Sequence, residues 1–271
     1  MPAVALPTGV SLFYDERGSG EPVLLIMGTG ADHTLWDATA KVFAERHRVI
    51  TYDQRGTGSS DHPPDPETYT ARVLADDAAA LLDALGVATA HVAGLSLGSA
   101  VAQELAINHP QKIRSLQLHC TWGKTDEWLD RLFQSMAYPL ERDDLAAFVK
   151  VGFMWTLSPT YLNDYPDQVR ELEEAYVANT PSRAGLLGHL HADRTHDAIG
   201  RLGEITAPTL ITSGEMDWQV PTRYGREVEW WIPGSRLHVF EGPFSSHCAF
   251  IEMPDEFNSV SLDFIAEHAL V

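Results

Sequence analysis

The sequence contains little cysteine, few basic residues and no long hydrophobic run. It has two cysteines in 271 residues, Cys120 and Cys248, and this excludes a disulfide framework. No stretch approaches the roughly 18 consecutive apolar residues that a membrane-spanning helix requires. Met1–Gly20 also lacks the charged and then apolar order of a secretion signal. We therefore expect a soluble, cytoplasmic protein that does not act at a membrane.

The shortage of basic residues argues against a nucleic-acid partner. Lys and Arg number 19 against 38 Asp and Glu, which gives a formal net charge of −19, and no basic cluster stands out. A phosphate backbone would be repelled by such a surface. With 44% hydrophobic residues and this length, the chain can bury a full α/β core. We expect a small-molecule substrate, and the sequence does not indicate an oligomeric state.

Short apolar runs alternate with helix-length segments along most of the chain. Such runs are typical of strands buried on both faces of a parallel sheet, and the alternation predicts βαβ units in an α/β fold. Helices are expected around Trp36–Arg46, over Leu74–Leu85 with Gly86 as a C-terminal cap, and at the end of the chain, where Phe257, Val260 and Phe264 share a face. The expected strands are Val23–Met27, Val49–Tyr52, a run ending His91-Val92-Ala93, Ile113–Leu118, Pro208–Thr212 and Leu237–Phe240.

This alternation stops between Trp122 and about Arg201. The intervening segment has no convincing strand, several helix-length pieces and many large apolar side chains. We therefore predict a core made of residues 1–123 and 201–271, with residues 124–200 inserted as a helical cap.

A G-x-S-x-G motif lies at Gly94–Gly98, directly after an expected strand and directly before an expected helix. In this context the serine stands on a turn so sharp that only glycine fits two residues to either side. The turn exposes the serine hydroxyl above the sheet. The motif therefore predicts Ser96 as a nucleophile.

A serine nucleophile needs a base and an acid that orients the base. His247 follows the last expected strand, and Asp217 follows the strand before it, so both lie at the carboxyl end of the sheet, where sites form in open α/β folds. The order Ser96, Asp217, His247 is that of the α/β-hydrolase triad. Glu215 is the alternative acid, because it occupies the same loop.

The developing oxyanion of an acyl transfer needs backbone donors. We expect one to be the N–H of Leu97, which follows the nucleophile. The second should come from the loop after the first buried strand. We choose the N–H of Thr29, because the glycines on either side of it leave the backbone there free to turn inward.

Several motifs together resemble the cap-bearing α/β-hydrolases. They are the D-x-R-G-x-G-x-S loop at Asp53–Ser60, the P-T-L…G-x-x-D…P element at Pro208–Pro221 and the closing H-x4-E-x-P-x-x-F pattern at His247–Phe257. The stretch Tyr52–Gly98 is most similar to 3-oxoadipate enol-lactonases, and Met27-Gly28 resembles methylesterase-type members. Two positions depart from the family: Met27 stands where a histidine is usual, and Ser246 where a glycine is usual.

The resemblance implies a serine hydrolase that cleaves a carboxylic ester or lactone through an acyl-enzyme and needs no cofactor. Two alternatives stay open from the sequence. The same triad could hydrolyse a C–C bond of a vinylogous diketone, or the scaffold could serve as a non-catalytic ligand-binding receptor. Serine at the motif, in place of aspartate, argues against the dehalogenase and epoxide-hydrolase branches.

The substrate pocket is expected where the cap meets the sheet, and its walls should be apolar. Four cap cations could pair with an anionic substrate, but we expect them on the solvated outer face, which favours an uncharged ester or lactone. These cations are Lys124, Arg131, Arg183 and Arg194. The residues expected to line the pocket are Gly28, Trp122, Phe153, Met154, Trp155 and Trp218.

The segment Gly188–Arg194 nearly spells a histidine-rich zinc signature, and His196 follows it. Arg194 occupies the position of the final ligand, so we predict no metal and expect solvated histidines here. We expect Asp53 and Arg55 to anchor their own loop, and Cys248 to act as a small buried hydrophobic residue.

Overall fold

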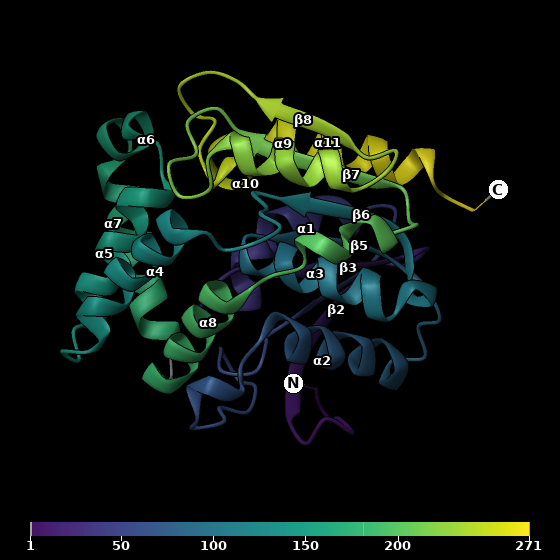
Figure 1. Ribbon diagram of the computed structural model, residues 1–271, viewed down its shortest axis with the longest axis horizontal. Coiled ribbons are helices and arrows are strands. Elements are labelled where there is room, and N and C mark those ends of the chain that lie inside the picture. The colour runs from purple at the N-terminus through teal and green to yellow at the C-terminus, as the bar shows by residue number, and fades with distance from the viewer. Residues whose placement is uncertain (1, 181, 271) are drawn as a thin grey trace.

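The apolar runs form the centre of one eight-stranded sheet in the order β1-β2-β4-β3-β5-β6-β7-β8. This computed structural model describes residues 2–180 and 182–270 (Figure 1). Strands β3 to β8 run parallel, whereas β1 and β2 pair antiparallel at one edge and were not predicted. The α/β fold class is confirmed. The strands are β1 Ala3–Ala5, β2 Ser11–Arg17, β3 Pro22–Ile26, β4 Arg48–Tyr52, β5 Ala90–Leu95, β6 Ile113–His119, β7 Thr209–Gly214 and β8 Arg236–Phe240.

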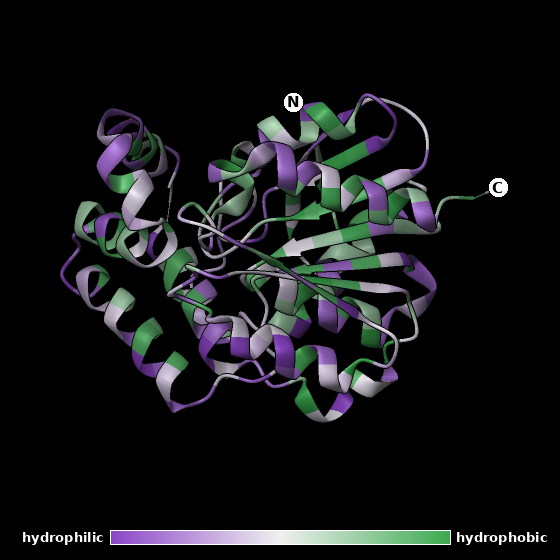
Figure 2. Cartoon of the chain, turned by 90° about the horizontal axis from the view of Figure 1, so that it is seen from above, coloured by the Kyte–Doolittle hydropathy of each residue, from purple (hydrophilic) through white to green (hydrophobic). Residues whose placement is uncertain are grey.

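Helices cover both faces of this sheet. Side chains of α2, α3 and α9 pack on one face, and those of α1 and α11 pack on the other. Alternate residues of a strand therefore enter different layers. Leu24 of β3 packs with α2, α3 and α9, whereas Leu25 packs with α1 and α11. Figure 2 shows hydrophobic residues gathered along the strands between these layers. The helices are α1 Asp37–Phe43, α2 Ala71–Ala84, α3 Leu97–Asn108, α9 Thr222–Trp231, α10 Ala249–Glu252 and α11 Pro254–Glu267.

In the described residues between β6 and β7, the α-helices α4 to α8 form a separate group beside the sheet (Figure 1). We call them the α4–α8 segment. An antiparallel bridge between Lys124 and Asp197 joins the two ends of this segment. Among the described residues, no helix is both long enough and apolar enough to cross a membrane. The helices are α4 Glu127–Leu140, α5 Leu145–Thr156, α6 Pro159–Asp164, α7 Pro166–Asn179 and α8 Arg183–Thr195.

The parallel register brings distant parts of the chain to one edge of the sheet. Ile26 of β3 is opposite Gly94 of β5, and Leu95 is opposite His119 of β6. The loops that follow β3, β7 and β8 therefore leave the sheet at its carboxyl end, beside the turn after β5 that carries Ser96. This edge is where the candidate site is built.

The loop after β4 is held by one buried ion pair and by hydrogen bonds to Asp53, as expected for Asp53 and Arg55. Asp53 accepts hydrogen bonds from the N–H groups of His33 and Ser59. Arg55 makes two hydrogen bonds to Asp77 of α2, at 2.5 and 2.6 Å, and both side chains are buried. The loop is thus fixed to the sheet and to α2, and it presents the Arg55 carbonyl toward α8.

Asp77→Ala should lower the free energy of unfolding by about 3–5 kcal/mol, because it leaves a buried guanidinium without its partner. Arg131→Ala is the matched control, since its pair with Glu127 is exposed and worth about 0.5 kcal/mol or less. Urea unfolding measures both values. Equal effects of the two substitutions would contradict the structural role of the Arg55–Asp77 pair.

Candidate active site

Ser96 stands on a strained turn between β5 and α3. Its backbone has φ 55° and ψ −123°, a conformation that a non-glycine residue adopts only when its surroundings enforce it. A Cβ on Gly94 would lie 2.1 Å from the Gly98 carbonyl oxygen, and one on Gly98 would lie 2.2 Å from the Ile26 carbonyl oxygen. The two glycines are therefore a steric requirement of this turn.

His247 and Asp217 reach this turn from the loops after β8 and β7. His247 Nδ1 lies 2.8 Å from Asp217 Oδ2, and both side chains are buried. The other carboxylate oxygen, Oδ1, accepts the N–H groups of Gln219 and Val220 at 3.0 and 2.8 Å. Asp217 is thus fixed by its own loop and is free to bond the imidazole only through Oδ2.

Glu215, the alternative acid, is in a different environment. Its side chain is exposed and lies 3.4 Å from the Gly242 N–H, with no contact to His247. The structure therefore brings Asp217, and not Glu215, to the imidazole. The Ser246 hydroxyl, at the position where the family has glycine, donates a hydrogen bond to Glu252 and so holds the His247 loop.

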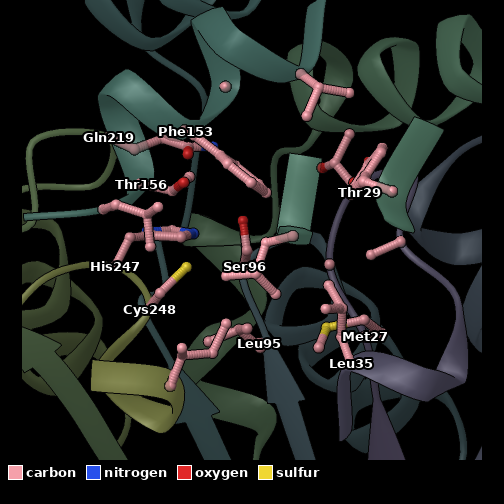
Figure 3. Close-up of a pocket in the computed structure, with 18 of the residues that line it drawn as sticks. Met27, Thr29, Leu35, Leu95, Ser96, Phe153, Thr156, Gln219, His247 and Cys248 are labelled. Carbon is pink, nitrogen blue, oxygen red and sulfur yellow. The ribbon is translucent and has the colours of Figure 1, made fainter. Parts of the chain in front are cut away.

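Ser96 and His247 line one cavity of about 100 Å³. Figure 3 shows the imidazole edge directed toward the Ser96 hydroxyl, although no hydrogen bond joins these two described side chains. Such contacts often tighten only when substrate binds. The serine and the imidazole are therefore placed for proton transfer to occur once the cavity is filled.

The loop after β3 passes beside the serine. A Cβ on Gly28 would lie 3.8 Å from Ser96 Oγ. Among the described residues the Thr29 N–H has no hydrogen-bond acceptor, and Leu97 is the first residue of α3, so its N–H has no partner inside the helix. Both amides predicted from the sequence are therefore available near Ser96.

The cavity is almost entirely apolar. Among the described residues, no Asp, Glu, Lys or Arg lines it. The hydrocarbon walls come from the loop after β3, from α4, α5 and α7 and from the His247 loop. The lining residues are Met27, Gly28, Thr29, Ala31, Leu35, Leu95, Ser96, Met136, Phe148, Val149, Gly152, Phe153, Thr156, Leu157, Leu172, Tyr176, Gln219, His247, Cys248, Phe250 and Ile251.

Of the six predicted pocket residues, Gly28 and Phe153 line the cavity and four do not. Trp122 is fully buried against Phe133 in the core. Met154 is 60% exposed and Trp218 is 47% exposed, so both face outward. Trp155 packs partly buried against the main core cluster. Neighbouring positions of a helix point about 100° apart, so only Phe153 of α5's three consecutive large residues faces the cavity.

The four cations considered for an anionic substrate do not line the cavity and pair with exposed or partly exposed acids. Lys124 pairs with Asp197, Arg131 with Glu127, Arg183 with Asp143 and Arg194 with Asp130. Cys248 was expected to be a buried hydrophobic residue, but it is half-buried and lines the cavity.

The histidine-rich segment of α8 corrects a prediction. His189 and His196 were expected to be solvated, but both are buried, as is Asp193. His189 Nδ1 accepts the Gly30 N–H at 3.0 Å, and its Nε2 lies 2.9 Å from the Arg55 carbonyl oxygen. Asp193 accepts the Thr29 hydroxyl at 2.7 Å. The signal available in the sequence was the spacing of four between His189 and Asp193, which places them on one helix face.

Potential metal ligands gather at one place in the described residues, where atoms of Cys120, Asp217 and His247 lie within 4.8 Å of one another. Asp217 and His247 already bond each other, and the Cys120 thiol donates to the His247 carbonyl. Burial, with Asp217 nearby, raises the pKa of the Cys120 thiol well above its usual value, which disfavours the thiolate that a metal requires. Nothing in this donor set indicates a resident metal.

A family model described as the alpha/beta hydrolase fold matches residues 21–254. The chain belongs to the α/β-hydrolase family. It is 32% identical over 256 residues to a protein from Azorhizobium caulinodans that is provisionally named the carbamate hydrolase RutD, covering 94% of this chain and 95% of that one. The family match and the name of this relative identify the chain as a hydrolase.

Solved structures agree on the fold. A hydrolase from Pseudomonas aeruginosa PA01 superposes with a TM-score of 0.89 at 30% identity, covering 97% of each chain. The enol-lactonase of Burkholderia xenovorans LB400 has a TM-score of 0.89 at 24% identity, covering 98% of this chain and 100% of its own. At that identity the second match shows a shared fold alone.

The buried carboxyl of Asp193 makes stability depend on pH. Burial raises its pKa to about 8, above that of an unfolded aspartate, so the protonated form stabilises the fold at low pH and its contribution is lost as pH rises through about 8. Between pH 6 and pH 9, wild type should therefore lose more unfolding free energy than Asp193→Asn, whose side chain is neutral throughout. Urea unfolding at both pH values measures this. Equal losses in wild type and Asp193→Asn would contradict the raised pKa of the Asp193 carboxyl.

Proposed function

We propose that this hydrolase cleaves an uncharged carboxylic ester or lactone through an acyl-enzyme. One observation carries the proposal: the Asp217–His247 pair and Ser96 meet at a cavity that no Asp, Glu, Lys or Arg among the described residues lines. A hydrocarbon wall favours a neutral acyl group, because an anion would lose its hydration without gaining a cation. The exposed ion pairs of the four cations support the same conclusion.

In this mechanism Ser96 Oγ attacks the substrate carbonyl while His247 accepts the hydroxyl proton. Asp217 holds the imidazole in the tautomer that has its free nitrogen toward Ser96. The Thr29 and Leu97 N–H groups donate to the oxyanion, and collapse expels the alcohol, which takes the proton from His247. Water then attacks the acyl-enzyme in the same way and releases the acid.

The α4–α8 segment serves as a cap in this proposal. Its helices α4, α5 and α7 supply part of the cavity wall, and this apolar wall limits bulk water around the reacting groups, which strengthens the hydrogen bonds to the oxyanion. A carbamate ester is a second candidate substrate, because the name of the Azorhizobium relative indicates it and the same attack on a carbonyl would cleave it.

Ser96→Ala should abolish covalent labelling by a fluorophosphonate and lower ester turnover by several orders of magnitude, because the nucleophile is removed. Labelling is followed by mass spectrometry, and circular dichroism checks the fold. Ser59→Ala is the control and should label normally. Label that persists in Ser96→Ala would overturn the assignment.

Asp217→Asn should reduce kcat by roughly ten-thousand-fold, because the imidazole is then held in the wrong tautomer. Glu215→Gln, the matched control in the same loop, should have a mild effect because its side chain is exposed. Steady-state kinetics on one ester compares the two variants. The reverse ranking would make Glu215 the acid.

Kinetics on two esters that differ only by a terminal carboxylate tests the charge preference. The neutral ester should have the higher kcat/KM, since no Lys or Arg of the described chain lines the cavity. A strong preference for the anion, lost on replacing Lys124, Arg131, Arg183 or Arg194 with Ala, would contradict the proposal and favour an anionic enol-lactone.

A further inference from the structure

Gln219 is a polar side chain set into an otherwise apolar wall. It is only 2% exposed, it lines the cavity, and its carboxamide oxygen has no hydrogen-bond partner among the described residues. Figure 3 shows it above His247, next to Thr156. The Thr156 hydroxyl, beside the weakly accepting Cys248 thiol, also lacks a hydrogen bond of good geometry.

A buried carboxamide without a partner is costly, by about 1–3 kcal/mol per unsatisfied group. The backbone keeps Gln219 in place, because its N–H donates to Asp217. The side chain therefore remains at the cavity wall. Its oxygen has almost no accessible surface in this conformation, so a ligand contacts it once the carboxamide turns about its last side-chain bond. An ester or lactone group has acceptors only, so it cannot serve the carboxamide oxygen. A secondary amide offers both a donor N–H and an acceptor C=O.

We propose that Gln219, assisted by Thr156, is a specificity subsite for an amide or carbamate group on the acyl part of the substrate. The inference rests on the proposed ester or lactone hydrolysis and names its substrate class: a neutral ester or lactone that carries an N–H donor close to the scissile carbonyl.

The test compares 4-nitrophenyl N-acetylglycinate with 4-nitrophenyl pentanoate, which have acyl chains of equal length with and without the amide. Gln219→Met keeps the length of the side chain and removes its hydrogen bonds. The variant should lower kcat/KM for the amide ester about tenfold more than for the alkyl ester, the effect of one lost hydrogen bond. Thr156→Val should change the same ratio in the same direction.

An unchanged ratio in both variants would overturn the subsite, including the case in which water alone satisfies Gln219. Hydrolysis of neither ester by wild type would instead overturn the proposed function. Because the ratio is taken within one protein preparation, partial unfolding of a variant affects both substrates equally and cannot imitate the expected result.

Three side chains of the α4–α8 segment hold the loop that carries Thr29. Tyr176 donates to the Thr29 carbonyl at 2.9 Å, Asp193 accepts the Thr29 hydroxyl, and His189 accepts the Gly30 N–H. Helix α8 is itself fixed, because a Cβ on Gly185 would lie 2.0 Å from the Gly56 carbonyl oxygen.

We infer that His189 and Asp193 are positioning residues that hold the Thr29 N–H toward the oxyanion. They touch no reacting atom and act only through the loop. At pH 7 the raised pKa of Asp193 makes its carboxyl neutral, so asparagine can replace it as an acceptor. Leucine cannot.

Asp193→Leu should lower kcat and the rate of fluorophosphonate labelling by roughly ten- to a hundred-fold with little change in KM, because the loss of an oxyanion donor affects the transition state. Asp193→Asn should restore most of this rate. A variant that loses thermal stability but keeps the wild-type kcat in its folded fraction would show a structural role only. Equal loss in both variants would likewise overturn the inference.

Discussion

The site depends on one steric constraint, the turn at Ser96. Strand β5 must end and α3 must begin within a few residues, and the chain achieves this only with Ser96 in a disfavoured backbone conformation and with glycine at positions 94 and 98. The cost of the strained residue is of order 1–3 kcal/mol. The parallel sheet enforces it, because β5 is paired with β3 on one side and β6 on the other. The strain is what raises a hydroxyl above the sheet edge.

The other parts of the site are arranged around that hydroxyl by independent means. Asp217 is oriented by its own loop amides, and Glu252 secures the loop of His247. Helix α8 links the loop after β4 to the loop after β3 through His189. The α4–α8 segment therefore does more than line the cavity. Its contacts reach the backbone beside Ser96, so its packing and the proposed oxyanion donors are coupled.

Much of the core was predictable because the local sequence preferences of these segments agree with their environment in the fold. Continuous apolar runs became buried parallel strands, and Gly86 ends α2 with φ +67° as a C-terminal glycine should. The glycines around Ser96 indicate the turn directly. The edge strands β1 and β2 were missed because one is very short and the other is half-polar, so neither has a buried-strand pattern.

The cavity walls could not be read from the sequence. Helix α5 is apolar on most sides, so periodicity could not show that Phe153 faces the cavity while Met154 faces solvent. His189 was expected to be solvated, because polar residues are usually exposed. His189 and Asp193 are both buried, because their partners belong to residues more than a hundred positions away: two backbone groups for His189 and the Thr29 hydroxyl for Asp193. The spacing of four places the two residues on one helix face, but nothing local in the sequence identifies their distant partners.

The most direct test of the central claim is to trap the acyl-enzyme. Wild-type protein is mixed with a neutral 4-nitrophenyl ester, quenched in acid within milliseconds and analysed by intact and peptide mass spectrometry. The account predicts a transient mass increase equal to the acyl group, located on Ser96. Turnover with no adduct at any time, or an adduct on Cys248 or another residue, would contradict it.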